Sequence, residues 1–181
     1  SPIATLAWPE SPGLLARSAT ASLQVSPLLQ VSLAPVPPAI APGGFIEYRA
    51  EYLNAGDGID QRAWIVIPVH PNTRLDWVAA GSANPAVWFS TTSYPVAQVN
   101  SDAFIRSHFF QGTLNQNGTP ADPSDDFWTF PFGTRMMAVF LDDPEVNLFP
   151  CGIEHELVWR VQDNGSDIGT LIEQPFGYFA D

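Results

Sequence analysis

The sequence contains no lysine, a single cysteine and few charged residues of either sign. Because Cys151 stands alone, the composition excludes an intramolecular disulfide and any zinc site built on cysteine. Charged residues make up 14% of the 181 residues, well below the roughly 25% that is usual in globular domains. Coiled coils and helical bundles need dense Ala, Glu, Lys, Leu and Arg, so this composition argues against both classes.

The charges that are present are mostly negative. Nineteen acidic residues against 7 arginines give a formal net charge of −12. A polyanion gains nothing from counterion release at phosphates, so we expect no nucleic-acid partner and no binding to anionic membrane surfaces. No apolar run approaches the ~18 residues of a membrane span, and residues 63–69 are far too few, so we expect no membrane insertion. Calcium or a basic partner surface is electrostatically favoured.

Helix signals are scarce, whereas strand signals are frequent. Prolines recur from Pro2 to Pro175, and no stretch sustains apolar residues at helical spacing. Alternation of apolar and polar residues predicts strands with one buried face at 29–33, 46–52, 155–161 and 168–172. Further strands are predicted at 62–69, 75–79, 87–91 and 136–141. Many short strands without helices predict an all-β, immunoglobulin-like antiparallel β-sandwich.

The alternation also predicts which side chains form the core. Tyr48, Tyr52, Leu157, Trp159 and Val161 should face the space between the sheets, and His155 should lie at the core or its boundary. Residues 100–135 break the strand rhythm and have Pro, Asn, Gly and Asp at their centre. We therefore expect that segment to be an elaborated surface loop.

The N-terminal residues 1–27 stand outside the predicted sandwich of residues 28–181. They contain an alternating segment, 19–26, whose apolar side consists of Ala19, Ala21, Leu23 and Val25. An isolated strand cannot bury that side, and Pro27 separates it from the domain. We predict an assembly arm that adds to the open sheet edge of a neighbouring subunit, a head-to-tail contact that yields a filament. The alternative is an edge strand on the sheet of its own chain.

Two acidic groups are candidate calcium ligands, and two asparagines are candidate glycosylation sites. Asp163, Asn164 and Asp167 place oxygen atoms around a glycine, as short calcium loops do, and the 100–135 segment contributes Asp122, Asp125 and Asp126. The bidentate Glu of an EF-hand is missing, so a hydrated Asx turn is the alternative interpretation. Apart from calcium, no cofactor is expected.

Asn117-Gly118-Thr119 and Asn164-Gly165-Ser166 are N-glycosylation acceptor sequences, which place the candidate glycans on Asn117 and Asn164.

No constellation of catalytic residues stands out, so we expect a protein that is not an enzyme. The three histidines, His70, His108 and His155, are 38 and 47 residues apart, which matches no zinc motif. Cys151 next to Gly152 is more readily explained as a turn residue or a small buried hydrophobe than as a nucleophile. The sequence has neither a nucleophile elbow nor a phosphate-binding loop.

Six tryptophans raise the alternative of a carbohydrate-binding module with exposed rings. Trp88 and Trp128 are adjacent to Phe89 and Phe127, and neighbouring residues of a strand point to opposite faces. One ring of each pair should therefore face outward, where it would meet a sugar or a neighbouring subunit.

Short motifs from residue 29 onward resemble those of a known family. The N-terminal motifs are Leu29-Gln30-Val31-Ser32, Ala41-Pro42-Gly43-Gly44 and Asn54-Ala55-Gly56-Asp57, and the C-terminal ones include Pro150-Cys151-Gly152 and Ile168-Gly169-Thr170. In these motifs the chain resembles the immunoglobulin-like conserved repeat domains of bacterial and archaeal cell-surface proteins. Cys151 and the long insertion near residues 100–126 depart from the family pattern. The resemblance implies an exported structural or adhesive module, without catalytic residues to carry over.

These features together predict a non-catalytic structural subunit of an extracellular filament, pilus or surface layer at the cell surface. Its partners would be copies of itself, arranged head to tail. The alternative is a carbohydrate-binding or adhesive module of a secreted protein, with polysaccharide as the partner. A size measurement on the purified protein separates the two, because the first predicts very large assemblies and the second a monomer that binds polysaccharide.

Overall fold

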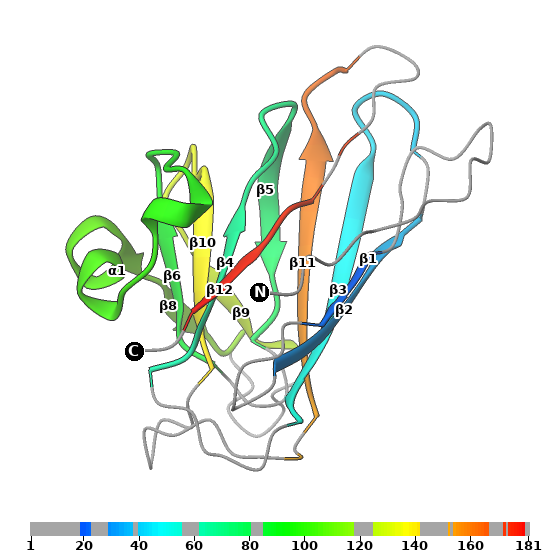
Figure 1. Cartoon of the computed structure of the whole chain (residues 1–181). Helices are drawn as coiled ribbons and strands as arrows, with labels where there is room; N and C mark the ends of the chain where they lie inside the picture. The colour runs from blue at the N-terminus through cyan, green and yellow to red at the C-terminus, as the bar shows by residue number, and fades with distance from the viewer. Residues whose placement is uncertain are drawn as a thin grey trace.

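The computed structural model describes residues 19–22, 29–37, 40–55, 62–80, 85–117, 125–141, 152, 154–166, 172 and 174–179. In this part of the chain antiparallel sheets pack face to face (Figure 1), which confirms the all-β sandwich. The first sheet has the order β1 (Ala19–Ser22), β2 (Leu29–Val36), β3 (Phe45–Asn54), β11 (His155–Asp163), β5 (Thr73–Val78). The second has the order β12 (Gly177–Phe179), β4 (Trp64–Pro68), β10 (Met136–Phe140), β6 (Val87–Ser90), β7 (Phe110–Gln111). A two-stranded sheet joins β8 (Thr113–Asn115) to β9 (Phe127–Thr129).

Seven of the predicted strands are present. The segments predicted at 29–33, 46–52, 62–69, 75–79, 87–91, 136–141 and 155–161 correspond to β2, β3, β4, β5, β6, β10 and β11, with boundaries shifted by a few residues. The strand predicted at 168–172 lies outside the described residues except for Ile172, which is buried and belongs to no strand.

The main core lies between the two large sheets, and the alternation in β3 and β11 fills it. As predicted, Tyr48, Tyr52, Leu157, Trp159 and Val161 are buried, none more than 2% exposed, in one cluster with side chains of the second sheet. The Tyr48 and Trp159 rings stack with their centroids 5.3 Å apart, and burial raises the pKa of Tyr48 to about 12. His155 is half-buried and stacks on the Tyr52 ring, which confirms its predicted place at the core boundary.

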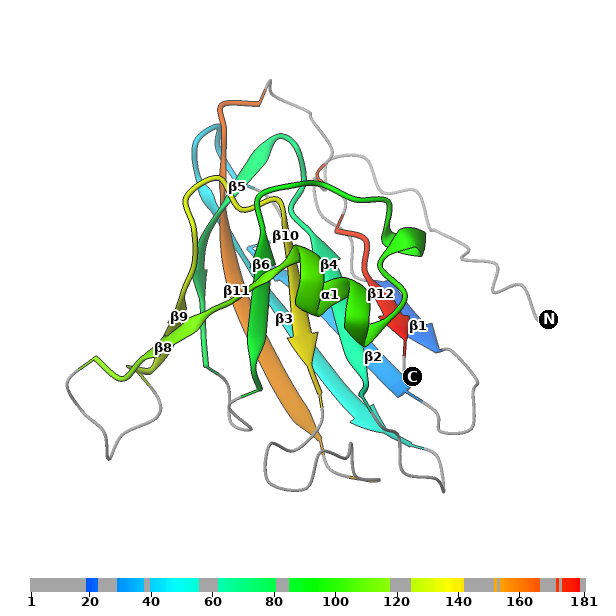
Figure 2. The same cartoon turned by 90° about the vertical axis from the view of Figure 1, so that its left-hand side faces the viewer.

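The central strands β4 and β10 of the second sheet are buried on both faces. In β4, Ile65 and Ile67 face the main core, while Trp64 and Val66 belong to a second cluster on the outer face. The helix α1 (Asp102–His108) lies over that outer face (Figure 2) and contributes Ile105, which is fully buried. Continuous apolar sequence in β4 is what a strand buried on both faces requires.

The expectation of a surface loop at 100–135 without helices is wrong. The segment contains α1, β7, β8 and β9, and the short 3-10 helix η1 (Val96–Gln98) precedes it. The α1 helix begins after Ser101, whose hydroxyl accepts a hydrogen bond from the Phe104 N–H at 3.3 Å. It is stabilised further by an ion pair of 2.7 Å between Asp102 and Arg106, one turn apart. With 7 residues, the helix is too short for its apolar periodicity to show in sequence.

Candidate functional site

The predicted assembly segment lies at one edge of the first sheet. Strand β1 pairs antiparallel with β2 of the same chain, with Ala19 opposite Leu33 and Ala21 opposite Val31. Within the described residues β2 is its only strand partner, because β1 ends the strand order. This pairing corresponds to the alternative prediction, in which residues 19–26 form an edge strand on the sheet of their own chain. The predicted boundary between the arm and the sandwich, at residues 27 and 28, therefore falls between two strands that pair with each other. Leu23 and Val25 lie outside the described residues, as do the side chains of β1.

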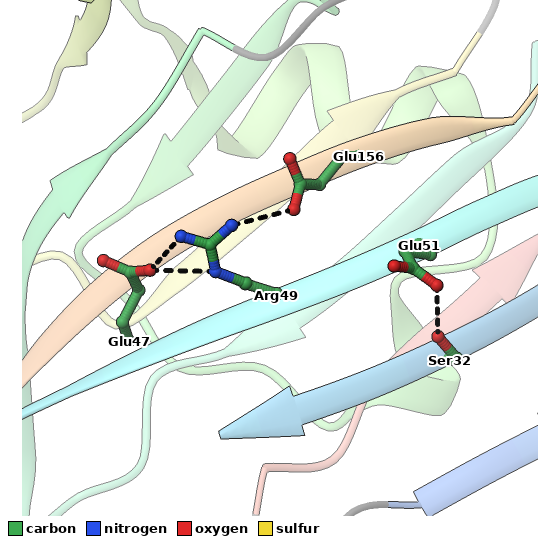
Figure 3. Close-up of polar contacts among 5 residues, drawn as sticks. All are labelled: Ser32, Glu47, Arg49, Glu51 and Glu156. Carbon is green, nitrogen blue, oxygen red and sulfur yellow. Dashed lines mark hydrogen bonds and ion pairs between the residues drawn. The ribbon is translucent and has the colours of Figure 1, made fainter. Parts of the chain in front are cut away.

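The outer face of the first sheet next to this edge is polar. Arg49 on β3 bridges Glu47 and Glu156, with nitrogen–oxygen distances of 2.8 and 3.3 Å, and Ser32 on β2 donates a hydrogen bond to Glu51 (Figure 3). Exposed ion pairs of this kind contribute about 1 kcal/mol or less. Ser32 lies opposite Glu51 on β3 and opposite Thr20 on β1, so these two pairs define the register of β2 with both neighbouring strands.

Asp163 closes a turn at the end of β11. Its side chain is buried, and its carboxylate accepts hydrogen bonds from the N–H groups of Gly43 at 2.8 Å, Gly165 at 2.9 Å and Ser166 at 3.0 Å. Burial alone would raise the pKa of Asp163, but the hydrogen bonds from Gly43, Ser166 and Gly165 outweigh it and hold the pKa below the ordinary 3.8. These donors occupy oxygens that calcium would need, so the contacts favour the Asx turn. Asn164 is exposed, and Asp167 lies outside the described residues.

We expect Asp163→Asn to lower the free energy of unfolding by about 1–3 kcal/mol at neutral pH, because the substitution weakens the charge-assisted, part-buried hydrogen bonds that the N–H groups of Gly43, Gly165 and Ser166 donate to the carboxylate. The folded-state pKa is lower than the unfolded one. The stabilisation is therefore present above a pH of about 4 and is lost as the pH falls through the folded-state pKa. Urea titrations at neutral pH and at several lower values should show the gap between the two proteins narrowing in acid.

Asp76→Asn is the matched control, because Asp76 forms a surface ion pair with Arg160 at 2.7 Å and should contribute about 1 kcal/mol or less. The expected role of the Asp163 carboxylate is contradicted if the Asp163→Asn protein is as stable as the parent, or if the difference in stability between the two proteins persists in acid.

Melting curves with and without chelator test the calcium prediction on the same samples. A lower melting temperature on chelation that excess calcium restores supports a calcium loop, and an unchanged curve supports the Asx turn.

The other acidic candidates do not form a complete ligand set within the described residues. Asp126 is buried, and its Oδ1 has no hydrogen-bond partner there. Asp125 is half-buried and accepts a hydrogen bond from the Asn117 side chain at 3.2 Å, while Asp122 lies outside the described residues. In the part of the chain that the structure describes, no three His, Cys, Asp or Glu side chains are grouped as a metal site requires. Calcium binding here stays a prediction.

Both candidate glycosylation sites are accessible. Asn117 is exposed in a turn with a positive φ of 47°, and its side-chain nitrogen is held by Asp125. Asn164 is exposed directly after β11, and its N–H donates to the Asn72 carbonyl at 2.9 Å. A glycan on either residue would therefore point away from the core.

The expectation of an outward-facing ring in each aromatic pair is only partly met. Trp128 and Phe89 are buried. Phe127 and Trp88 are half-buried, and Trp88 packs against the second cluster beneath α1. The helix, which the sequence did not predict, covers the face on which Trp88 lies. The exposed rings among the described residues are those of Phe45, Phe110 and Phe132, which are 44, 62 and 94% exposed.

A hollow of about 430 Å³ opens beside β5. Strand β5, the turn before β10 and the end of β11 line it, through Thr73, Arg74, Leu75, Asp76, Phe130, Phe132, Gly133, Thr134, Arg135 and Asn164. Gly133 has a φ of 79°, a conformation that favours glycine and turns the chain sharply beside the Phe132 ring. No sequence pattern predicts this site, and its one signal is an aromatic residue inside the turn Pro131-Phe132-Gly133.

Comparison with protein-family models, with curated proteins and with solved structures finds no match for the chain. In the described part of the chain, no helix has the length and apolarity that crossing a membrane requires.

Proposed function

We propose that the chain is a non-catalytic structural subunit of an extracellular filament, pilus or surface layer, joined head to tail to copies of itself by exchange of β1. The observation that carries the proposal is the position of β1, a strand of 4 residues that is bound to its sheet through β2 alone within the described residues. The immunoglobulin-like character of the sandwich and its resemblance to cell-surface repeat domains belong to the same proposal.

A second copy of the chain can supply the β1 strand that pairs with β2. Ala19 and Ala21 lie opposite Leu33 and Val31, which are buried in the main core. The β1 strand of a neighbouring copy would meet the same partners, so exchange conserves the backbone hydrogen bonds. Residues 23–28 connect β1 to β2, and six residues in extended conformation span about 20 Å. That length allows the strand to leave its own sheet and reach another copy.

A disulfide between two copies tests the exchange directly. In a Cys151→Ser background, one protein carries Thr20→Cys and a second carries Ser32→Cys, the two positions that face each other across β1 and β2. Residues opposite each other on antiparallel strands have Cα atoms about 4.5–5.5 Å apart, which suits a disulfide. We expect the mixed proteins to form covalent dimers on mild oxidation, measured by non-reducing gel electrophoresis, because β1 of one copy lies on β2 of the other.

The matched control pairs Thr20→Cys with Glu51→Cys, which lies on β3 and one strand further from β1. Random collisions would link this pair as well, whereas strand exchange would not. If the Thr20/Ser32 mixture links no better than the control, while both substitutions in one chain give an intramolecular bond, then β1 stays on its own sheet and the proposal is wrong. Deletion of residues 1–26 complements the test and should leave a folded protein that no longer forms large assemblies.

A further inference from the structure

We propose that the hollow beside β5 binds a sugar ring of an oligosaccharide, with Phe132 as the stacking surface and Arg135 as the main hydrogen-bond donor. This inference goes beyond the proposed assembly role and does not depend on strand exchange. A cavity of about 430 Å³ lies within the range of roughly 300–1,000 Å³ that small-molecule sites occupy.

The hollow combines an apolar surface with polar groups at its rim. Leu75 is buried and Phe130 is half-buried, so they provide apolar contact, while the Phe132 ring is 94% exposed. A pyranose ring has two apolar C–H faces and a circumference of hydroxyl groups, so it needs one flat apolar partner and several polar ones. Because the Phe132 ring is almost fully exposed, its face is available for such a contact.

The polar lining offers donors and acceptors that the fold does not use. The Arg135 side chain makes no hydrogen bond or ion pair with the described residues, whereas Arg49, Arg106 and Arg160 are held in ion pairs. A guanidinium carries five N–H donors in a rigid fork, which suits adjacent hydroxyl groups. The exposed Asn164 amide adds a donor and an acceptor.

The second half of the polar lining is fixed by contacts within the protein. The Arg74 guanidinium donates to the Gln162 side chain, and Asp76 is held by Arg160. Thr73 and Thr134 are buried and donate their hydroxyl hydrogens to the carbonyls of His70 and Pro131, which fixes both side chains. Side chains held in this way lose little conformational freedom when a ligand binds.

The edge strand itself disfavours a peptide as the occupant. A peptide would add to β5 through backbone hydrogen bonds, with alternate side chains in pockets. Arg74 and Asp76, which line the hollow, alternate with buried residues along β5. Charged side chains on an edge strand are a recognised protection against the addition of a further strand.

Binding is tested with the full chain, produced in a host that adds no N-glycans so that Asn164 stays unmodified. The probes are tetrasaccharides of glucose, of N-acetylglucosamine and of galacturonic acid, titrated by calorimetry and by NMR. We expect one or more to bind in the millimolar range or tighter, and Phe132→Ala and Arg135→Gln each to weaken that binding at least about tenfold, a factor equal to about 1.4 kcal/mol. Preference for galacturonic acid would identify a carboxylate partner for Arg135, and preference for the others would identify hydroxyl recognition.

Phe45→Ala and Arg49→Gln are the matched controls, since Phe45 is also an exposed ring and Arg49 is an exposed arginine on the outer face of the first sheet. Both should bind as the parent does. The proposal is overturned if no probe binds at millimolar concentration, or if binding survives Phe132→Ala and Arg135→Gln combined. It is also overturned if sedimentation shows that Phe132→Ala abolishes self-association while no sugar binds, because the hollow would then be a contact between copies.

Discussion

Replacing Trp159 by alanine is expected to lower the free energy of unfolding by about 3–5 kcal/mol, the usual cost of truncating a large buried aromatic residue. Trp159 is 2% exposed and lies in β11, between β3 and β5. Its ring stacks on Tyr48 with an interplanar angle of 23°. The truncation would remove this contact and leave a cavity between the sheets. Urea titration followed by far-UV circular dichroism measures the change without relying on tryptophan fluorescence.

Tyr48→Phe is the control for this prediction, because it changes the stacking partner without removing the ring. The Tyr48 hydroxyl is buried and has no hydrogen-bond partner among the described residues. Removing it should therefore change the free energy of unfolding by no more than about 0.5 kcal/mol, or increase it. A cost below about 1 kcal/mol for Trp159→Ala would mean that Trp159 lies at the surface and that the inferred phase of β11 is wrong.

The second large effect is expected at Trp64, in the cluster beneath α1. Trp64 is fully buried, its ring lies 4.7 Å from that of Phe140, and its indole N–H donates to Asp102 on α1 at 3.2 Å. Trp64→Ala should cost about 3–5 kcal/mol and should also loosen α1. Hydrogen exchange of the α1 amides should then be faster, relative to those of β11, than in the parent protein.

Arg106→Gln separates the contribution of the aromatic packing from that of the charge. The Arg106 guanidinium carbon lies 5.5 Å from the centre of the Trp88 ring and 5.7 Å from that of Phe140, and its side chain is 48% exposed. Loss of this cation–π contact and of the ion pair with Asp102 should cost about 1 kcal/mol or less. If Arg106→Gln destabilised the protein as much as Trp64→Ala, the charge rather than the buried ring would hold the helix.

The first sheet could be predicted from sequence because one of its faces meets water. In β3 and β11 the polar outer residues alternate with buried ones, so the strands, their phase and the core residues all followed from the pattern. The second sheet gave less information. Strands β4 and β10 are buried almost throughout, so their sequence indicates a strand but not what covers each face. The covering helix was missed because it spans two turns at most.

The candidate sites depended on contacts between distant segments, which a sequence pattern does not contain. Asp163 occurs in a run of residues that suits either a calcium loop or an Asx turn. The contact that favours the turn comes from Gly43, 120 residues away. The hollow beside β5 is formed by residues from three separate segments, so Arg135 and Asn164 had no recognisable spacing. For β1, the alternation of apolar and polar residues predicts a strand but not its partner, so the sequence alone leaves two alternatives: pairing with its own sheet or with another copy.

The burial of β4 and β10 on both faces has a consequence for protein that is partly unfolded. When α1 opens, Trp64, Val66, Met136 and Ala138 lose their cover on the outer face. The sequences of β4 and β10 then present β-prone, uncharged and strongly apolar surface, which is the signature of segments that aggregate. Opening of this one short helix should therefore limit the solubility of the chain before the sandwich itself unfolds. Aggregation on heating should then depend on protein concentration, and Trp64→Ala should accelerate it.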